Sequence, residues 1–372
     1  MDPLVSAGEA LHAMQTRMCA RRNTDTVGIR HHVAMTLQTR FTEAYGLSTP
    51  IAQAGMAFVG MTPDLAIAVS NAGALGCLGV GLMPAPALTK TIAAIRAGTA
   101  QPFNVNFITI FAEQTHIDAV CAAGVAVASF HWGHPPRAWI EQLHAAGVGV
   151  FEQVGSVEAA KRAADDGVDV VVAQGQEAGG HNYSTLPTFA LVPLVADAVA
   201  PALVLAAGGI ADGRGLAAAL MLGADGAWVG TRFVATTESE AHEGYKSRVV
   251  AAQATETVRT GMFGPEYPQF NPMRVLRNRV VREWQDRMEE VPADTSGLPV
   301  IGHMDLDGQR VEMHKFSYLV PMRERTTGDL EEMALLAGQG VGLVNTVQPA
   351  ATVVAEMTAQ ARAILNRYRQ PG

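Results

Sequence analysis

The sequence has few charged residues and no long apolar run. Only 17% of its 372 residues are charged, and the net charge of -8 comes without a cluster of Lys and Arg, which argues against nucleic acid as a partner because neutralising phosphates needs clustered cations. No apolar stretch approaches the ~18 to 20 residues needed to cross a bilayer. Asp2 and Glu9 interrupt the first apolar pattern, which is untypical of a signal peptide. We expect a protein of the cytoplasm with no membrane partner.

Cysteines and nucleotide-binding glycine motifs are also scarce. Cys19, Cys77 and Cys121 lie far apart and form no CxxC pair, so neither a disulfide framework nor a zinc site is indicated. No GxGxxG motif follows a strand pattern and opens a helix, which argues against a Rossmann nucleotide domain.

What the sequence does contain is one repeating unit: a short β-branched run, a turn, and a helix that ends in glycine. Strict alternation of strands and helices predicts a parallel sheet, and closure into a (β/α)8 TIM barrel is the economical arrangement. An open, doubly wound sheet is the alternative. The eight expected strands are 50–56, 75–80, 103–109, 125–131, 148–153, 168–174, 202–207 and 225–231.

The extent of this repeating strand–helix pattern divides the chain into four parts. Residues 1–34 are an N-terminal extension outside the pattern, and residues 35–255 are the barrel. Residues 256–335 are rich in Pro, Arg and Glu, and we interpret them as an inserted, mostly helical cap with a hairpin turn at Asp307 and Gly308. Residues 336–372 return to the barrel and form a final helix.

The sixth expected strand delivers a titratable side chain to a loop. Its apolar run ends in Gln174, a glycine-rich turn and His181, and parallel α/β folds place catalytic groups in loops at the carboxyl ends of strands. We therefore predict that His181 is catalytic. The alternative is a loop histidine without a role.

Glycine-rich turns follow the last two expected strands. Ala206–Ile210 includes Gly208 and Gly209, and Val229–Thr231 includes Gly230. These two loops are the usual phosphate site of barrels, because glycines let backbone N–H groups approach the oxygens. Asn106 adds amide groups at the mouth, and Ala54, Gly55 and Met56 leave a flat apolar surface. Together these features suggest flavin mononucleotide (FMN), although the glycines are also compatible with simple tight turns.

Two other clusters have simpler explanations. His131 and His134 stand three apart, but no carboxylate or cysteine is placed in the sequence to complete a ligand set, so we predict no metal. We expect His131 to line the substrate pocket. The arginines at 274, 277, 279 and 282 suggest a solvated helix face, with binding of an anionic substrate as the alternative.

Seven segments resemble the nitronate monooxygenases, formerly called 2-nitropropane dioxygenases, a family related to enoyl-acyl-carrier-protein reductase II. The QGxEAGGH pattern within 173–181 is the specific one. The resemblance implies that His181 is the catalytic histidine. It also implies that FMN is bound by Asn106, Gln174, Gly179, Gly180, Gly209, Trp228, Val229, Gly230 and Thr231. The chain departs from the family at His131, Asn182 and Tyr183, where the substrate should lie. The matching segments are 49–57, 69–79, 102–109, 173–181, 206–215, 223–239 and 337–342.

The resemblance implies oxidation of an alkyl nitronate or nitroalkane by O2 to a carbonyl compound and nitrite. An NAD(P)H-dependent reductase of a quinone or an enoyl thioester is the second hypothesis, and a flavin-binding protein without turnover is the third. A homodimer is a further hypothesis that the sequence leaves open.

Overall fold

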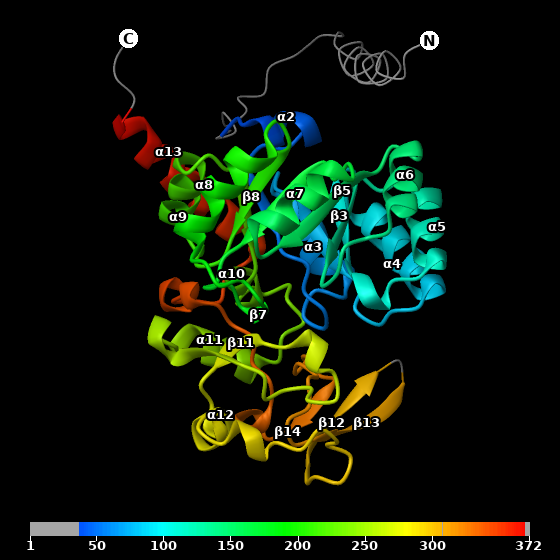
Figure 1. The fold of residues 1–372 in the computed structure, drawn as a ribbon, viewed down its shortest axis with the longest axis vertical. Helices are drawn as coiled ribbons and strands as arrows, with labels where there is room; N and C mark the ends of the chain where they lie inside the picture. The colour runs from blue at the N-terminus through cyan, green and yellow to red at the C-terminus, as the bar shows by residue number, and fades with distance from the viewer. Residues whose placement is uncertain (1–36, 307, 369–372) are drawn as a thin grey trace. The chain divides into compact units, whose positions relative to one another are not determined.

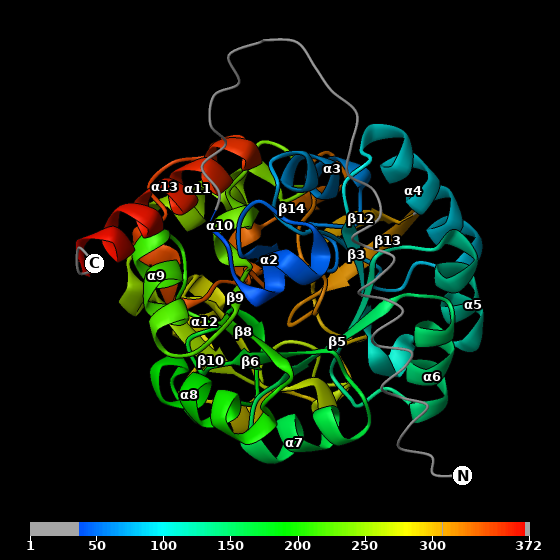
Figure 2. The same cartoon turned by 90° about the horizontal axis from the view of Figure 1, so that it is seen from above.

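Eight parallel strands form a closed barrel, with helices between them (Figures 1 and 2). The computed structural model describes residues 37–306 and 308–368. Strands pair in the order β1-β9-β8-β6-β5-β4-β3-β2, and a parallel bridge between Ala52 and Leu75 joins β1 to the entrance of β2. The predicted (β/α)8 TIM barrel is therefore confirmed. Its strands are β1 (Ile51–Gln53), β2 (Gly76–Gly79), β3 (Phe103–Ile108), β4 (Val127–His131), β5 (Gly149–Val154), β6 (Val170–Gln174), β8 (Leu203–Ala207) and β9 (Gly226–Val229).

Several of the surrounding helices begin at start signals in the sequence. Pro63 is the first residue of its helix, and the Ser156 side chain accepts a hydrogen bond from the Ala159 N–H group. The carboxylate of Asp212 accepts hydrogen bonds from the N–H groups of Arg214 and Gly215, so Asp212 is the N-cap of its helix. The helices on and around the barrel are α2 (Arg40–Tyr45), α3 (Pro63–Asn71), α4 (Ala85–Gly98), η1 (Thr109–Phe111), α5 (Gln114–Ala123), α6 (Arg137–Ala145), α7 (Val157–Asp165), α8 (Thr188–Val199), α9 (Gly213–Met221), α10 (Thr231–Val234), α11 (Glu243–Ala251) and α13 (Ala350–Tyr368).

The barrel interior is filled with side chains and is closed at one end by α2. Phe41 of α2 lies with its ring centroid 6.1 Å from that of Phe151 in β5, which in turn lies 6.5 Å from Trp228 in β9. Arg40 holds α2 in place through two 2.8 Å bonds to the carboxylate of Asp225. Figure 2 shows α2 across the barrel axis, and Figure 1 places the cap at the opposite end. A ligand site therefore has to lie at the carboxyl ends of the strands.

The cap is built mainly from short strands, so the prediction of a mostly helical segment was wrong. β11 pairs antiparallel with β10 and also with β7, and β12 pairs with β13 and β14. Leu306 pairs with Gln309, which confirms the predicted hairpin, while Asp307 itself lies outside the described residues. The elements are β7 (Gly180–His181), η2 (Ala254–Glu256), β10 (Thr257–Thr260), η3 (Pro268–Phe270), β11 (Met273–Leu276), α12 (Arg279–Trp284), η4 (Met288–Glu290), β12 (Val300–Leu306), β13 (Gln309–His314), β14 (Thr326–Gly328), η5 (Leu330–Glu332) and η6 (Gln339–Leu343).

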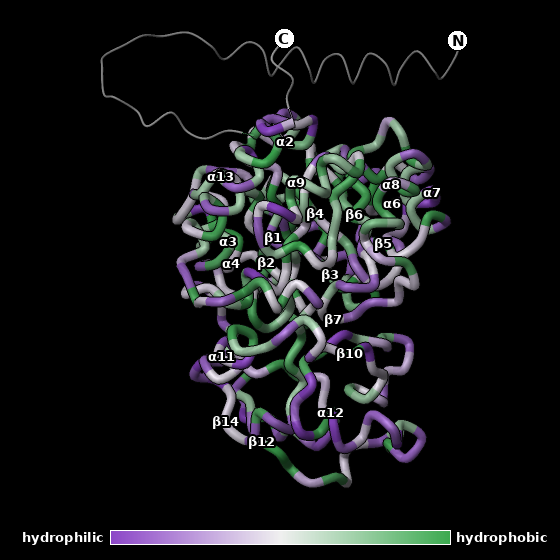
Figure 3. The backbone as a smooth tube through the Cα atoms, turned by 90° about the vertical axis from the view of Figure 1, so that its left-hand side faces the viewer, coloured by the Kyte–Doolittle hydropathy of each residue, from purple (hydrophilic) through white to green (hydrophobic). Residues whose placement is uncertain are grey.

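The physical reason is that apolar residues of the cap strands are buried in small separate cores. Met273 and Val275 of β11 are buried in one small core, and Met304 and Met313 of the β12–β13 hairpin are buried in another. Many of the residues between these two cores are hydrophilic (Figure 3), so the apolar positions are too sparse to form a clear pattern in the sequence. The predicted extension, residues 1–34, lies outside the described residues. No helix in the described part of the chain combines the length and apolar character needed to span a membrane.

The last helix, α13, packs closely against the barrel. A Cβ atom on Gly213 of α9 would lie 2.4 Å from the carbonyl oxygen of Met357, so the two helices touch backbone to backbone. The Gly213 N–H group donates to the Gln360 side chain at 2.8 Å, and the Thr49 and Thr358 hydroxyls are 2.7 Å apart. These contacts tie α13 to α9 and to the segment that precedes β1.

We propose that the fold needs this return segment and not the extension. Deleting residues 337–372 should leave the protein insoluble, because it exposes the buried face of α9 and removes Val353, Val354 and Met357 from the core. Soluble yield and a cooperative thermal melt measure this. Deletion of residues 1–34 is the matched control and should melt as the full chain does; a soluble, cooperative C-terminal truncation would contradict the proposal.

Candidate active site

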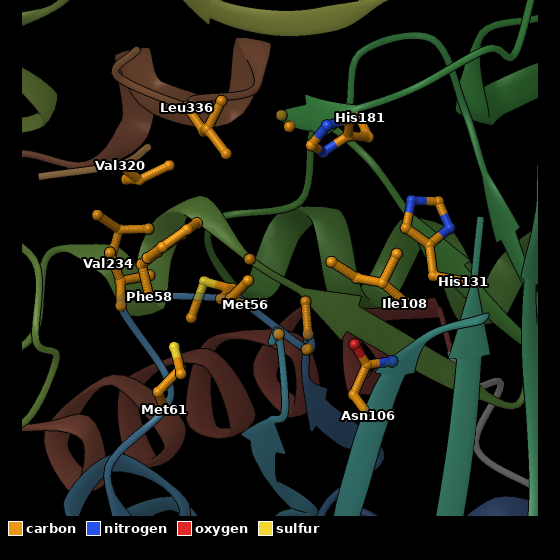
Figure 4. A pocket seen from close by; sticks show the side chains of 18 of the residues that line it. Met56, Phe58, Met61, Asn106, Ile108, His131, His181, Val234, Val320 and Leu336 are labelled. Carbon is orange, nitrogen blue, oxygen red and sulfur yellow. The ribbon is translucent and has the colours of Figure 1, made fainter. Parts of the chain in front are cut away.

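A cavity of about 760 Å3 opens at the carboxyl ends of the barrel strands and extends into the cap. Figure 4 shows His181 and His131 on one side of it, and Met56, Phe58, Met61 and Val234 on the other. Leu336 and Val320 close it from the cap side, and Asn106 lies at the barrel side. The cavity has the size of a site for a cofactor and a small substrate.

The strand register brings predicted site residues to one level of the barrel. Gln174 in β6 pairs with Ala207 in β8, and Ala207 pairs with Trp228 in β9. Two buried polar atoms at this level have no hydrogen-bond partner in the described chain, Gln174 Oε1 and Trp228 Nε1. Both residues line the cavity. Because an unpaired buried polar group is costly, this acceptor and this donor indicate a polar ligand.

One wall of the cavity is made of glycines that cannot be exchanged freely. Gly208 has φ 108° and Gly209 has φ 72°, a region that favours glycine. A Cβ atom on Gly208 would lie 2.8 Å from the Thr188 hydroxyl, so the backbone also needs the space. Across the cavity, a Cβ atom on Gly55 would lie 2.0 Å from the Asn106 side chain. The predicted cofactor residues that line this cavity are Ala54, Gly55, Met56, Asn106, Gln174, Gly179, Gly180, Gly208, Gly209, Trp228, Gly230 and Thr231.

His181 is held by strand pairing rather than placed on a free loop. It belongs to β7 and pairs with Met273 of β11, and its carbonyl oxygen accepts a 3.2 Å bond from Gln174 Nε2. Burial lowers the pKa of His181 to about 3, and the nearby imidazole of His131 adds to the lowering. His181 therefore belongs to a paired strand and not to a loop as predicted, and its imidazole is neutral at pH 7.

His131 lies at the end of β4 and lines the same cavity. The amide nitrogen of Gln153 lies 3.0 Å from His131 Nδ1. Burial lowers the pKa of His131 to about 4, against a smaller opposing effect from the backbone of His181 and Gln153. Two neutral imidazoles thus share one side of the cavity.

Three predicted site residues do not line the cavity: Val229, Asn182 and Tyr183. Val229 is buried in β9. The Asn182 side chain donates to the carbonyls of Gly175 and Ala178 and accepts the Ser184 N–H group, so it holds the glycine-rich turn. Tyr183 packs 4.6 Å from the Trp132 ring and is 41% exposed. The assignment of Asn182 and Tyr183 to the substrate pocket is therefore corrected.

An aromatic wall that was not predicted stands beside His181. Trp132 is buried with φ 68°, and its ring centroid is 4.8 Å from that of His181. Its indole N–H group donates to the carbonyl of Gln269, which ties the loop after β4 to the cap. Phe270 completes the wall, 6.0 Å from Trp132 and 6.5 Å from His181. The only signal in the sequence was the bulky residue after His131, because the contacts come from distant segments.

The remaining predicted clusters are structural. His134 bonds Glu152 at 2.7 Å and Asp166 at 2.9 Å, so carboxylates that are remote in sequence surround it. No group of three or more potential metal ligands occurs in residues 37–306 and 308–368. Arg274 is buried and donates to the carbonyl of Gln176, whereas Arg279 pairs with Asp329 and Glu332. The arginines are therefore not one solvated helix face.

The two depressed histidine pKa values predict acid sensitivity. An unfolded histidine gains a proton below pH ~6.5, whereas folded His131 and His181 stay neutral down to about 4 and about 3. The unfolded state then binds more protons, so the unfolding free energy should fall as pH drops from 6.5 to 4.5, by up to about 1.4 kcal/mol per pH unit for each histidine.

Urea unfolding at several pH values measures this slope. His131→Asn should flatten it, and His144→Asn is the control, because bonding to Asp169 raises the pKa of His144 instead. An identical slope in wild type and His131→Asn would contradict the prediction.

Known proteins resemble this chain over most of its length. A family model described as nitronate monooxygenase matches residues 38–116 and 109–360. A nitronate monooxygenase of Paraburkholderia phytofirmans is 31% identical over 374 residues, which covers 87% of this chain and 95% of that protein. The structure of FabK from Thermotoga maritima aligns with a TM-score of 0.73 and 33% identity, covering 89% of this chain and 98% of FabK.

A further relative is a dehydrogenase. It is the (3aS,4S,5R,7aS)-5-hydroxy-7a-methyl-1-oxo-octahydro-1H-indene-4-carboxyl-CoA dehydrogenase of Rhodococcus jostii, 40% identical over 223 residues. The match covers 60% of this chain and 62% of that relative, so it spans less than two thirds of the relative's length.

Proposed function

Because the chain belongs to the nitronate monooxygenase family, we propose that it is an FMN-dependent oxidoreductase that oxidises an alkyl nitronate or nitroalkane with O2 to a carbonyl compound and nitrite. One observation carries the proposal. His181 shares a single cavity with a glycine wall and with two unpaired buried polar atoms, Gln174 Oε1 and Trp228 Nε1.

The residues present fit FMN. Gly208, Gly209 and Gly230 would hold its phosphate through their backbone N–H groups, since anions bind such glycine-rich loops in barrels. Gln174 and Trp228 would offer their unpaired acceptor and donor atoms to the flavin ring. Bound there, FMN would accept electrons from the substrate and pass them to O2.

The protein's own part is proton transfer and shielding. Neutral His181 can accept the proton that a nitroalkane loses from the carbon beside its nitro group, which leaves the anionic nitronate and an imidazolium cation. The charge of the anion then favours the protonated ring, although burial alone disfavours it. Trp132 and Phe270 cover the imidazole and keep water from this side of the cavity.

A reductase is the second candidate, and the extent of the apolar lining favours it. The cap contributes Phe263, Tyr267, Phe270, Tyr318, Val320 and Met322 to the cavity. A short nitronate needs little of this surface, whereas the relative in Rhodococcus jostii is named for a fused-ring carboxyl-CoA substrate. In this alternative NAD(P)H reduces the flavin, and a quinone or an enoyl thioester is the acceptor.

Anaerobic mixing separates the candidates. The yellow holoenzyme is mixed in a stopped-flow instrument with propionate 3-nitronate or with NADPH, and the visible flavin absorbance is followed. Rapid bleaching by the nitronate alone is the expected result. Rapid bleaching by NADPH alone would establish the reductase, and bleaching by neither would support flavin binding without turnover.

A further inference from the structure

The cavity has a second half that the proposed cofactor and His181 do not use. Tyr267, Tyr318, Val320 and Met322 line it from the cap, and the barrel residue Met61 also lines the cavity. Every one of these side chains is apolar or aromatic. In Figure 4 Val320 and Leu336 lie on the same side of the cavity as Phe58 and Val234, and the four residues belong to one apolar cluster.

This apolar half ends at the cap sheet. Leu306 closes β12, Gln309 opens β13 and Arg325 directly precedes β14, and all three residues line the cavity. The carbonyl oxygen of Arg325 accepts a 2.8 Å bond from the N–H group of Asp305, which fixes the Arg325 backbone to β12. Gln309 and Arg325 are both exposed, so they form the rim of the cavity rather than its interior.

Arg325 alone carries a permanent charge among the described residues that line the cavity, and no Asp, Glu or Lys accompanies it. The lining of the cavity is therefore polar at the barrel end, apolar through the middle and cationic at the cap rim. A ligand that matches it has a reactive end, a long apolar body and an anionic end.

We propose that the substrate is an elongated apolar molecule whose far end carries a carboxylate or phosphate that Arg325 binds. This inference rests on the proposed function for the chemistry of the reactive end. The apolar body gains affinity from burial, about fourfold per methylene group placed in the cap half, and the anionic end orients the chain. An ion pair with an exposed guanidinium adds about two- to fivefold.

Two series of nitronates test the proposal in the holoenzyme. One is prepared from 1-nitroalkanes of three to ten carbons, and the other from ω-nitrocarboxylates of the same lengths. We expect kcat/KM to rise with length in both series. The carboxylates should gain an advantage of about two- to fivefold only in the longer members, because only these reach the cap rim. A flat length dependence, or no carboxylate preference at any length, would overturn the proposal.

Matched variants assign the preference to one side chain. Arg325→Met should abolish the carboxylate advantage and leave the length dependence of the uncharged series unchanged. Arg310→Met is the control, because Arg310 is an exposed arginine of the neighbouring strand β13 that does not line the cavity. Equal losses in both variants would show a general effect of surface charge and overturn the assignment.

Binding without turnover keeps this test separate from the proposed function. Calorimetric titration of the holoenzyme with octanoate and with octan-1-ol should show tighter binding of octanoate, and Arg325→Met should remove the difference. If no nitronate is oxidised but this difference is present, the inference holds and the proposed reaction fails. If Arg325→Met weakens NADPH and leaves octanoate unchanged, Arg325 binds the nucleotide and the inference is overturned.

Discussion

Replacing His181 with Asn should reduce turnover by ~10² to 10⁴ while the protein still folds and retains FMN. The backbone contacts of His181, its pairing with Met273 and the bond from Gln174 Nε2, do not involve the imidazole and remain in the variant. The variant loses only the imidazole ring and its edge contacts with Trp132 and Phe270, which should lower the free energy of unfolding by about 1 kcal/mol. Flavin content, thermal melting and steady-state rates are the measurements.

Two substrates identify the role of the ring. A preformed nitronate has already lost its proton, so a deficit confined to the neutral nitroalkane would identify His181 as the base. An equal deficit on both substrates would assign it to holding the anion or to the redox step. His131→Asn is the matched control, since His131 lines the same cavity and is also neutral, and it should affect KM more than kcat. Wild-type rates of His181→Asn on every substrate would contradict a catalytic role.

The barrel could be predicted from the sequence because each of its units is local. A β-branched run, a turn and a glycine-terminated helix recur, and every strand pairs with a neighbour of the same kind. The glycine wall was also predictable, because Gly208 and Gly209 adopt backbone angles that favour glycine in any context. The local sequence patterns were therefore sufficient to predict where the mouth of the barrel lies.

Only the β12–β13 hairpin of the cap could be predicted, because its pairing is local, whereas β7 pairs with a remote segment. β7 has only two residues, and it becomes a strand because β11, far along the chain, lies beside it. The same remote pairing places His181 in a strand, and burial there depresses its pKa. Asn182 was assigned to the substrate pocket because of its place beside His181 in the sequence. In the structure its amide group already donates to the carbonyls of Gly175 and Ala178, so it is not free to bind a substrate.

Replacing Gly209 with Val should release most of the FMN. Gly209 has φ 72°, where a β-branched residue is strained by about 1 to 2 kcal/mol, and its loop lines the cavity where the phosphate is proposed to bind. The fold should persist, since a Cβ atom there meets only the Glu177 side chain, at 3.6 Å. Loss of one or two charge-assisted hydrogen bonds weakens FMN binding by about 10- to 100-fold or more.

Gly46→Val is the control that separates the effect of backbone strain on stability from the effect of the Gly209 substitution on FMN binding. Gly46 has φ 66° at the end of α2, with nothing within 4 Å of its added Cβ atom, and it does not line the cavity. Both variants should therefore lose similar stability, while only Gly209→Val should lose flavin, measured by the fluorescence change when apoprotein is titrated with FMN. Wild-type FMN affinity in Gly209→Val would place the phosphate elsewhere. A wild-type protein that is colourless and cannot be reconstituted would remove FMN from the site, and the unpaired Gln174 and Trp228 atoms would then need a different ligand.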